Sequence, residues 1–358
     1  MQPCLADLYA NPSSVHREGQ RARAAVERAR EQVAALVHAH PNEVVFTSGG
    51  TEGDHLAILG AAWARRADGT RIAISAVEHH AVHGAGEVLT DQGWAVDHLP
   101  VGPDGRVEPD AFAPAAGTVL VSMMLANNET GVLQPVEQIA RRAREAGILV
   151  HCDAVQGAGK VAVDFRSLGV DYLVVSAHKM GGPKGAGALI VRRGAPLSPL
   201  FRGSGHERGL RGGTENLPGI VGLGAAAEWG ARDLATEAER LAALRQRLEA
   251  GIRAIAADAV IHGDRAPRLP NTVNVSFPGA RSDHLLMALD ARGIAVSAGA
   301  ACASGAVEPS PVLSAMGVPR EVAVCAVRLS MGRTTTAAEV DAVIGALRES
   351  VAAAGALA

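Results

Sequence analysis

Short apolar segments that alternate with helical stretches constrain the fold of this chain more than any other feature. Between residues 43 and 193 these segments are EVVFTS (43–48), RIAISA (71–76), AVDHLPV (95–101), TVLVSMM (118–124), ILVHCD (148–153), DYLVVS (171–176) and GALIVRR (187–193). Strands of this kind, separated by amphipathic helices, form a mostly parallel sheet with helices on both faces. The sequence therefore predicts an α/β fold for this part of the chain.

The pattern changes after residue 216. One long helix is predicted over 217–255, and mixed elements follow it: a strand TVNVSF, a helix over 281–293, a strand VRLSMG and a closing helix over 336–353. Mixed short elements of this kind indicate a smaller α+β domain. The predicted division is a large α/β domain of residues 1–234 and a small C-terminal domain of residues 235–358.

Composition excludes several classes of protein. The formal net charge is −3, so neither a nucleic-acid nor a membrane surface is indicated. No apolar run approaches the roughly 18 residues of a membrane span, and the N-terminus lacks the pattern of a signal peptide, so a cytoplasmic location is expected. The four cysteines form no CxxC pair, which argues against a disulfide framework or zinc ribbon and leaves a reactive thiol open.

The stretch VVSAHKMGGPKGAGALIV (174–191) places Lys179 at the end of a predicted buried strand. The chain contains only three lysines, Lys160, Lys179 and Lys184, among its 34 basic residues. A primary amine can attack a carbonyl, whereas a guanidinium stays protonated. Lys179 is therefore a candidate for Schiff-base chemistry, and a surface lysine on a turn is the alternative.

Polar clusters follow five of the predicted strands. They are SGGTEG after 43–48, EHH after 71–76, NNETG after 118–124, DAVQ after 148–152 and SAHK after 171–175. Because ligands of open α/β sheets bind at the carboxyl ends of strands, these clusters predict one site at one sheet edge.

An aldehyde cofactor such as pyridoxal 5′-phosphate would find suitable groups in these clusters. Asp153 suits a protonated pyridine nitrogen, and Asn128 and Gln156 suit the phenolic oxygen. The phosphate has the backbone N–H groups of Gly50 and Thr51 at a helix start, with Ser176 and His178 beside them. His79 suits the ring face. Singly, each residue also has a structural interpretation, such as a helix cap for Asp153 or a turn for Asn128.

Two competing motifs are incomplete. VQGAGKVA (155–162) resembles a nucleotide P-loop, but that motif needs glycine at Ala154 and Ser or Thr at Val161. EHHAVH places His79 and His83 four residues apart, yet it lacks the HExxH glutamate and an obvious third ligand. No metal site is predicted.

A set of longer motifs runs along the chain: FTSGGTE, EHHAV, NNETGVLQP, CDAVQ, SAHKMGGPKGAGAL, HERGLRGGTEN and SAGAACASGAVEPSPVL. Together they resemble the cysteine desulfurases of the iron–sulfur-cluster and nitrogen-fixation type, which are pyridoxal-phosphate enzymes of aminotransferase class V. The resemblance runs from Asn11 nearly to the C-terminus and implies the pyridoxal-phosphate transferase fold, that is, aminotransferase fold type I.

The resemblance also implies a role for each matched position. It places the cofactor lysine on Lys179, the pyridine-nitrogen acid on Asp153 and the ring-stacking histidine on His79. It places the substrate-carboxylate arginine on Arg328 and the catalytic cysteine on Cys302. The remaining cofactor contacts fall on Gly50, Thr51, Asn128, Gln156, Ser176, His178 and Thr214, of which Asn128 also belongs to the substrate site.

The implied reaction converts L-cysteine to alanine and leaves a persulfide on Cys302. Lys179 serves as the base at Cα, and the Cys302 thiolate attacks the substrate sulfur. Thr214 matches a phosphate ligand supplied by a neighbouring subunit, so a homodimer is implied. A sulfur-acceptor protein, either an iron–sulfur scaffold or a thiolation relay, is the implied partner. The alternatives are another class V aminotransferase, a selenocysteine lyase, or a truncated inactive paralogue that acts only in binding.

The sequence departs from the family pattern at three places. The family has an N-terminal strand segment before NPSS, where this sequence has a short stub before Asn11. His55 occupies the position of a family asparagine. The sequence ends at ESVAAAGALA, without the long tail that some members use to hold a scaffold protein.

Overall fold

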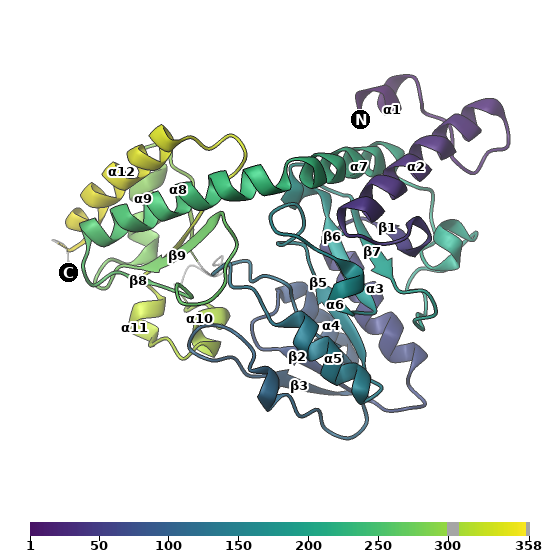
Figure 1. Ribbon diagram of the computed structural model, residues 1–358, viewed down its shortest axis with the longest axis horizontal. Coiled ribbons are helices and arrows are strands. Elements are labelled where there is room, and N and C mark those ends of the chain that lie inside the picture. The colour runs from purple at the N-terminus through teal and green to yellow at the C-terminus, as the bar shows by residue number, and fades with distance from the viewer. Residues whose placement is uncertain (299–307, 356–358) are drawn as a thin grey trace. The chain divides into compact units, whose positions relative to one another are not determined.

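The computed structural model describes residues 1–298 and 308–355, and the chain divides into two compact units (Figure 1). The first unit comprises Met1–Leu99, Pro109–Leu125 and Gln134–Leu234. The second comprises Pro100–Glu108, Ala126–Leu133 and Ala235–Ala358. From the sequence we expect residues 1–234 to bind the cofactor and residues 235–358 to carry the catalytic cysteine loop. This assignment of functions to the two parts stays a prediction.

The first unit is built on a seven-stranded sheet in the order β1-β7-β6-β5-β4-β2-β3. Strands β3, β2, β4, β5 and β6 pair in parallel with one another, and β7 runs antiparallel to both β6 and β1. The mostly parallel sheet predicted from the sequence is therefore confirmed. Its strands are β1 Val44–Thr47, β2 Arg71–Ser75, β3 Ala95–Leu99, β4 Thr118–Ser122, β5 Leu149–Asp153, β6 Tyr172–Ser176 and β7 Gly187–Val191.

Helices cover both faces of this sheet. Every residue of β4, β5 and β6 is buried, as expected for strands with helices on either side. Helix α5 shows how the sequence sets the packing, because Val136, Ile139, Ala140 and Ala143 form one buried stripe. The helices are α1 Gln2–Ala6, α2 Arg17–Leu36, α3 Gly50–Ala64, α4 His80–Asp91, α5 Val136–Glu145, α6 Phe165–Leu168 and α7 Leu217–Arg232, with short 3₁₀ turns at Pro41–Glu43, Pro109–Ala111, Ala177–Met180 and His206–Gly209.

The second unit has a four-stranded sheet in the order β10-β11-β9-β8, with antiparallel pairing throughout. Its core joins apolar residues of β9 and β11 to those of α8, α9 and α12. The elements are α8 Leu234–Ile255, β8 Val260–Ile261, β9 Thr272–Ser276, α9 Ser282–Asp290, β10 Ser297–Ala298, α10 Pro311–Ala315, α11 Arg320–Ala323, β11 Ala326–Ser330 and α12 Ala337–Gly355.

The single helix predicted over 217–255 is wrong in one respect. The chain forms α7 and α8 as separate helices, and Asp233 ends α7 as its C-cap residue. Asp233 also directly precedes Leu234, the first residue of α8, and aspartate favours turns and the position before a helix over a helix interior. Both helices are amphipathic, which is why the sequence pattern runs through the break.

Within residues 1–298 and 308–355, no helix combines the length and apolar character needed to cross a bilayer.

Candidate active site

Lys179 lies just beyond the carboxyl end of β6. The strand passes into the 3₁₀ turn Ala177–Met180, which ends at Gly181 with φ +83°. Ala177 is buried and its N–H donates to the Ala186 carbonyl at 3.0 Å, which anchors this turn to the segment before β7. The turn therefore presents the Lys179 amine from a rigid strand end.

Asp153 ends β5, the strand next to β6, and is 6% exposed. Its Oδ1 accepts a hydrogen bond from the Val155 N–H at 2.8 Å. Burial, followed by the charge of Asp54, raises the Asp153 pKa to about 7, although the charge of Lys179 acts in the opposite direction. A buried carboxyl in this state gains much from a cationic partner, and a protonated pyridine nitrogen is such a partner.

An anion site is built where α3 begins, beyond β1. Gly49 is its N-cap, and among residues 1–298 and 308–355 no side chain caps the helix, so the first-turn N–H groups at Gly50 and Thr51 lack a capping acceptor there. A Cβ at Gly50 would lie 3.0 Å from Val155 Cγ2, so glycine permits the close approach of this turn. Nearby, the Ser176 hydroxyl and His178 Nδ1 are 2.9 Å apart. These groups fit a phosphate.

His79 is the N-cap of α4, after the carboxyl end of β2. Its Nδ1 accepts a hydrogen bond from the Ala81 N–H at 3.1 Å, so in the neutral ring Nε2 carries the proton. Partial burial, then the positive charges of His80 and Lys179, lower the His79 pKa. The ring is therefore a neutral, fixed group at the same sheet edge as Asp153 and Lys179.

Gln156 lies in the turn that follows β5 and is partly buried. Its side-chain oxygen accepts a hydrogen bond from Lys160 at 3.2 Å. Gln156 was predicted from the sequence as a cofactor contact, whereas Lys160 had no predicted role.

Three further buried polar groups lie beneath this edge, and the sequence analysis assigned none of them. His151 Nε2 is 3.4 Å from Asp54 Oδ1, while His151 Nδ1 is 2.8 Å from the Ser122 hydroxyl. Burial raises the Asp54 pKa well above its usual value and lowers the His151 pKa to about 4. Glu78 accepts the Met124 N–H at 2.6 Å, and burial raises its pKa as well. Of these three groups only Glu78 belongs to a strand-end cluster, EHH, whereas Asp54 follows SGGTEG and His151 lies inside its strand.

The predicted substrate residues Arg328 and Asn128 are neighbours within the second unit. Arg328 projects from β11, and its Nη1 donates to the Asn128 carbonyl at 3.0 Å, while its Nη2 donates to the Ser297 hydroxyl at 3.2 Å. Both contacts orient the guanidinium. Cys302 lies outside the described residues.

Thr214 is exposed in the first unit. The preceding segment is anchored by the buried pair Arg30–Glu207 at 2.8 Å, and Glu207 also accepts the Phe46 N–H at 2.9 Å. Glu207 and Arg208 adopt positive φ values of 47° and 59°, which are unusual for side chains with a Cβ. The contacts of Glu207 hold this strained segment in one conformation, and Thr214 lies on the surface.

His55, which departs from the family pattern, lies on the second turn of α3. Its Nδ1 is 2.9 Å from the Thr51 carbonyl, so the ring is used in a local helix contact.

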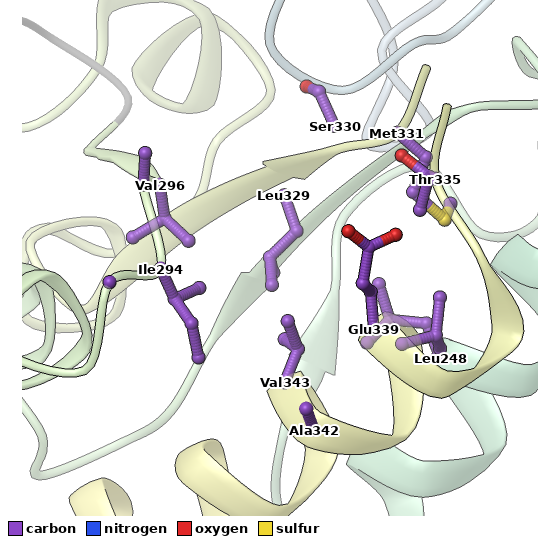
Figure 2. A pocket seen from close by; sticks show the side chains of 13 residues that line it. Leu248, Ile294, Val296, Leu329, Ser330, Met331, Thr335, Glu339, Ala342 and Val343 are labelled. Atoms are coloured by element: carbon purple, nitrogen blue, oxygen red, sulfur yellow. The ribbon is translucent and has the colours of Figure 1, made fainter. Parts of the chain in front are cut away.

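The second unit also has a cavity of about 270 Å³, lined by Ile294, Val296, Leu329 and Val343 among others (Figure 2). Its acidic residue, Glu339, accepts hydrogen bonds from the Thr336 N–H at 2.7 Å and hydroxyl at 2.9 Å. The Glu339 N–H also donates to Thr336 Oγ1, which completes a capping box at the start of α12. This acid therefore has a structural use, and the cavity contains none of the predicted site residues.

The fold and the lysine-centred edge define a class of protein, and comparison with known families gives the same class. The family model for aminotransferase class-V matches residues 1–343, so the chain belongs to this family.

Within it, the chain is a member of the cysteine desulfurase group. A curated relative, cysteine desulfurase IscS of Anaeromyxobacter sp. (strain Fw109-5), is 46% identical over 98% of this chain and 88% of its own length. The structure of a NifS-like protein has 37% sequence identity and a TM-score of 0.91, covering 98% of this chain and 94% of its own. A structure described as SspA in complex with cysteine has 35% identity and a TM-score of 0.81, covering 92% and 93%. The resemblance and fold type predicted from the sequence are confirmed.

Proposed function

We propose that this chain is a cysteine desulfurase that takes sulfur from L-cysteine and releases L-alanine. The observation that carries the proposal is the arrangement at one sheet edge: Lys179 follows β6, Asp153 ends the adjacent β5, and α3 begins beyond β1 without a side-chain cap from the described residues. An amine, a buried acid and an anion site are the groups that pyridoxal 5′-phosphate requires. The membership of the chain in the cysteine desulfurase group supports the choice of substrate.

Pyridoxal 5′-phosphate, when bound, supplies an aldehyde for amine attack and a ring that accepts electrons from the substrate carbon. Lys179 would hold the aldehyde carbon, and Asp153 the pyridine nitrogen. The amides of Gly50 and Thr51, with Ser176 and His178, would hold the phosphate. The ring would lie against His79, and the Gln156 and Asn128 side chains would bind the phenolic oxygen. Thr214 of a neighbouring copy would complete the phosphate site.

The reacting groups of the chain then have separate tasks. The Arg328 guanidinium binds the substrate carboxylate, and two donors in one plane suit it to this anion. The Lys179 amine takes the proton from Cα and later returns a proton to carbon. The Asp153 carboxylate keeps the proton on the ring nitrogen.

Cys302 completes the reaction, an assignment that rests on the resemblance and the family. Its thiolate attacks the sulfur of the substrate, an S–S bond forms, and the C–S bond breaks with its electron pair passing to carbon. The products are a Cys302 persulfide and, after protonation, alanine. A sulfur-acceptor protein, an iron–sulfur scaffold or a thiolation relay, would remove the persulfide sulfur.

The proposed setting is a cytoplasmic homodimer. The exposure of Thr214 supports the proposal that it contributes to the phosphate site of a neighbouring copy.

The test is turnover of L-cysteine by cofactor-loaded protein, with Cys302→Ser as the informative variant. Wild type should produce sulfide and alanine, and mass spectrometry after brief exposure should show one added sulfur on the Cys302 peptide. The serine variant should bind cofactor and L-cysteine yet produce almost no sulfide, because a hydroxyl is a poor nucleophile towards sulfur. Near-native sulfide release by this variant, or added sulfur on Cys4, Cys152 or Cys325, would refute the mechanism and favour an aminotransferase or lyase.

A further inference from the structure

Lys160 has no role in the reaction described above, yet it lies close to Lys179. The positive charge of Lys179 disfavours protonation of the Lys160 amine. Burial, followed by this charge, lowers the Lys160 pKa to about 8. Lys160 also contributes to lowering the pKa of His178, after burial and the other two lysines. A second partly buried amine beside the cofactor lysine needs an explanation, because arginine is the usual cation of this chain.

The local fold brings Lys160 back onto Gln156. Residues 154–161 form consecutive turns, closed by bonds from the Ala158 N–H to the Ala154 carbonyl at 2.9 Å and from the Lys160 N–H to the Gly157 carbonyl at 3.0 Å. Gly159 has φ +72°, and a Cβ there would lie 3.3 Å from Met180 Cγ, so glycine lets this turn pack against the residue after Lys179.

Two hydrogen bonds join Lys160 to Gln156. Lys160 Nζ donates to the Gln156 main-chain carbonyl at 2.8 Å and to Gln156 Oε1 at 3.2 Å. An ammonium group can only donate, so it must meet the oxygen end of the amide. The Nε2 end, which carries two protons, is therefore directed to the other side. Within the described residues, Gln156 Nε2 makes no hydrogen bond.

We propose that Lys160 is a positioning residue that fixes the Gln156 amide with its N–H end as the donor to the cofactor's phenolic oxygen. The inference rests on the proposed function, because Gln156 needs this orientation only if pyridoxal phosphate binds. An amide alone has two nearly isosteric orientations, and only one of them donates. Lys160 selects the donating one and places a positive charge behind it, and both effects stabilise a negative charge on the phenolic oxygen.

The measurement is the pH midpoint of the visible absorbance of cofactor-loaded protein without substrate. A donor and a cation beside the phenolic oxygen lower the proton affinity of the adjacent chromophore nitrogen. Lys160→Met should therefore raise the midpoint by about 1 pH unit, the size of one hydrogen bond to a charged group. Lys160→Arg, which retains the charge and the donors, should restore a midpoint close to that of wild type.

Matched variants separate this role from a structural one. Lys184→Met removes an exposed charge from the same neighbourhood and should leave the midpoint unchanged. Gln156→Glu keeps an oxygen for Lys160 but removes the amide donor, so it should raise the midpoint as Gln156→Leu does. The double variant Lys160→Met/Gln156→Leu should shift the midpoint by less than the sum of the two single variants, since the part of the Lys160 effect that passes through the amide is already lost in Gln156→Leu.

The outcomes distinguish the possible failures. An unchanged midpoint in Lys160→Met, or shifts that add fully in the double variant, would overturn the positioning role. A purely structural lysine would lower the thermal unfolding temperature of the cofactor-free protein without moving the midpoint, which also overturns it. Failure of the wild type to bind pyridoxal phosphate would instead reject the proposed function.

Discussion

The two units of the molecule bury polar groups in different ways. Beneath the edge of the seven-stranded sheet, Asp54 and Glu78 are almost fully buried, and in the described chain Asp54 Oδ1 and Glu78 Oε2 have no hydrogen-bond partner. In the second unit, the buried Glu249 meets the Arg268 guanidinium at 2.8 Å. The sheet edge of the first unit therefore holds buried acids that lack a guanidinium partner among the described residues, whereas Glu249 of the second unit, like Glu207 beside Arg30 elsewhere in the first, is neutralised within the protein.

Two buried histidines sharpen the contrast. His151 and His262 each lie 2.8 Å from a serine hydroxyl, and burial lowers the pKa of each to about 4. His151, however, lies 3.4 Å from Asp54, while His262 pairs with Ser276 of β9. A buried histidine–serine contact is thus part of an acidic cluster in the first unit, whereas in the second unit it joins the end of β8 to the neighbouring strand β9. Titratable groups with perturbed pKa values that cluster at one strand edge are characteristic of a functional site.

The largest effect should follow from removal of Lys179. Lys179→Ala and Lys179→Arg should both lose the visible band of bound cofactor and reduce sulfide release to background, because neither side chain can bond to the aldehyde or move the Cα proton. Absorbance spectra and a sulfide assay measure the two losses. Substantial activity in either variant would show that Lys179 is not the catalytic amine. The buried acids at this sheet edge would then not mark an active site, and the functional contrast with the second unit would be lost.

Asp153→Asn should be next in size. Without a carboxylate at the ring nitrogen, kcat should fall by about 100-fold or more, the range found for loss of one electrostatic stabiliser. The cofactor-free variant should nevertheless be more stable than wild type at pH 8, by roughly 1–3 kcal/mol.

The sign of this stability change follows from the raised pKa of Asp153, about 7 when folded against 3.8 as its ordinary value. Above pH 7 the folded protein contains the buried charge and its full destabilisation. As the pH falls from 7 towards 3.8 the folded state keeps a proton that the unfolded state lacks, so wild type recovers. Denaturant unfolding at pH 8 and pH 5 should show the advantage of Asp153→Asn shrinking at the lower pH. An equal or opposite change would contradict the interpretation.

His262→Gln tests the second unit, where the effect should be on stability alone. The folded His262 pKa is about 4 against 6.5 as its ordinary value, so its contribution is fully present above pH 6.5 and is lost as the pH falls towards 4. The variant should cost about 1 kcal/mol at pH 7, from the lost contact with Ser276, and should reduce the acid sensitivity of unfolding. Cofactor affinity should stay at the wild-type value, and a change in that affinity would blur the contrast between the units.

The smallest effect is expected at Thr214, on the surface and outside both buried sets. Thr214→Ala should weaken cofactor binding by roughly 5-fold, corresponding to about 1 kcal/mol for one hydrogen bond. Equilibrium titration with pyridoxal phosphate measures the affinity, and sedimentation measures the oligomeric state. A monomeric wild type with full cofactor occupancy would rule out the proposed contribution from a neighbouring copy.

Local sequence patterns determined the architecture of this chain. Apolar segments marked every strand of the seven-stranded sheet. The inner strands β4, β5 and β6 are apolar over most of their length because both faces are covered, whereas the edge strand β3 is only partly buried. The positions after those strands marked Lys179, Asp153, His79 and Gln156, because parallel strands end at a common edge. The break at Asp233 was missed, since amphipathic periodicity continues across it and only the helix end itself differs.

Tertiary structure alone decided which polar groups face one another. Asp54 and His151 are 97 positions apart in the sequence, and their 3.4 Å approach depends on how α3 packs over β5. The Lys160–Gln156 contact needs the reversed backbone at Gly159, and the sequence showed Lys160 only as a scarce lysine in an incomplete motif. Hydrophobic periodicity predicts which face of an element is buried. Whether two buried polar side chains form a hydrogen bond depends on differences of roughly a few tenths of an ångström in the distance between them, and only the packed fold sets that distance.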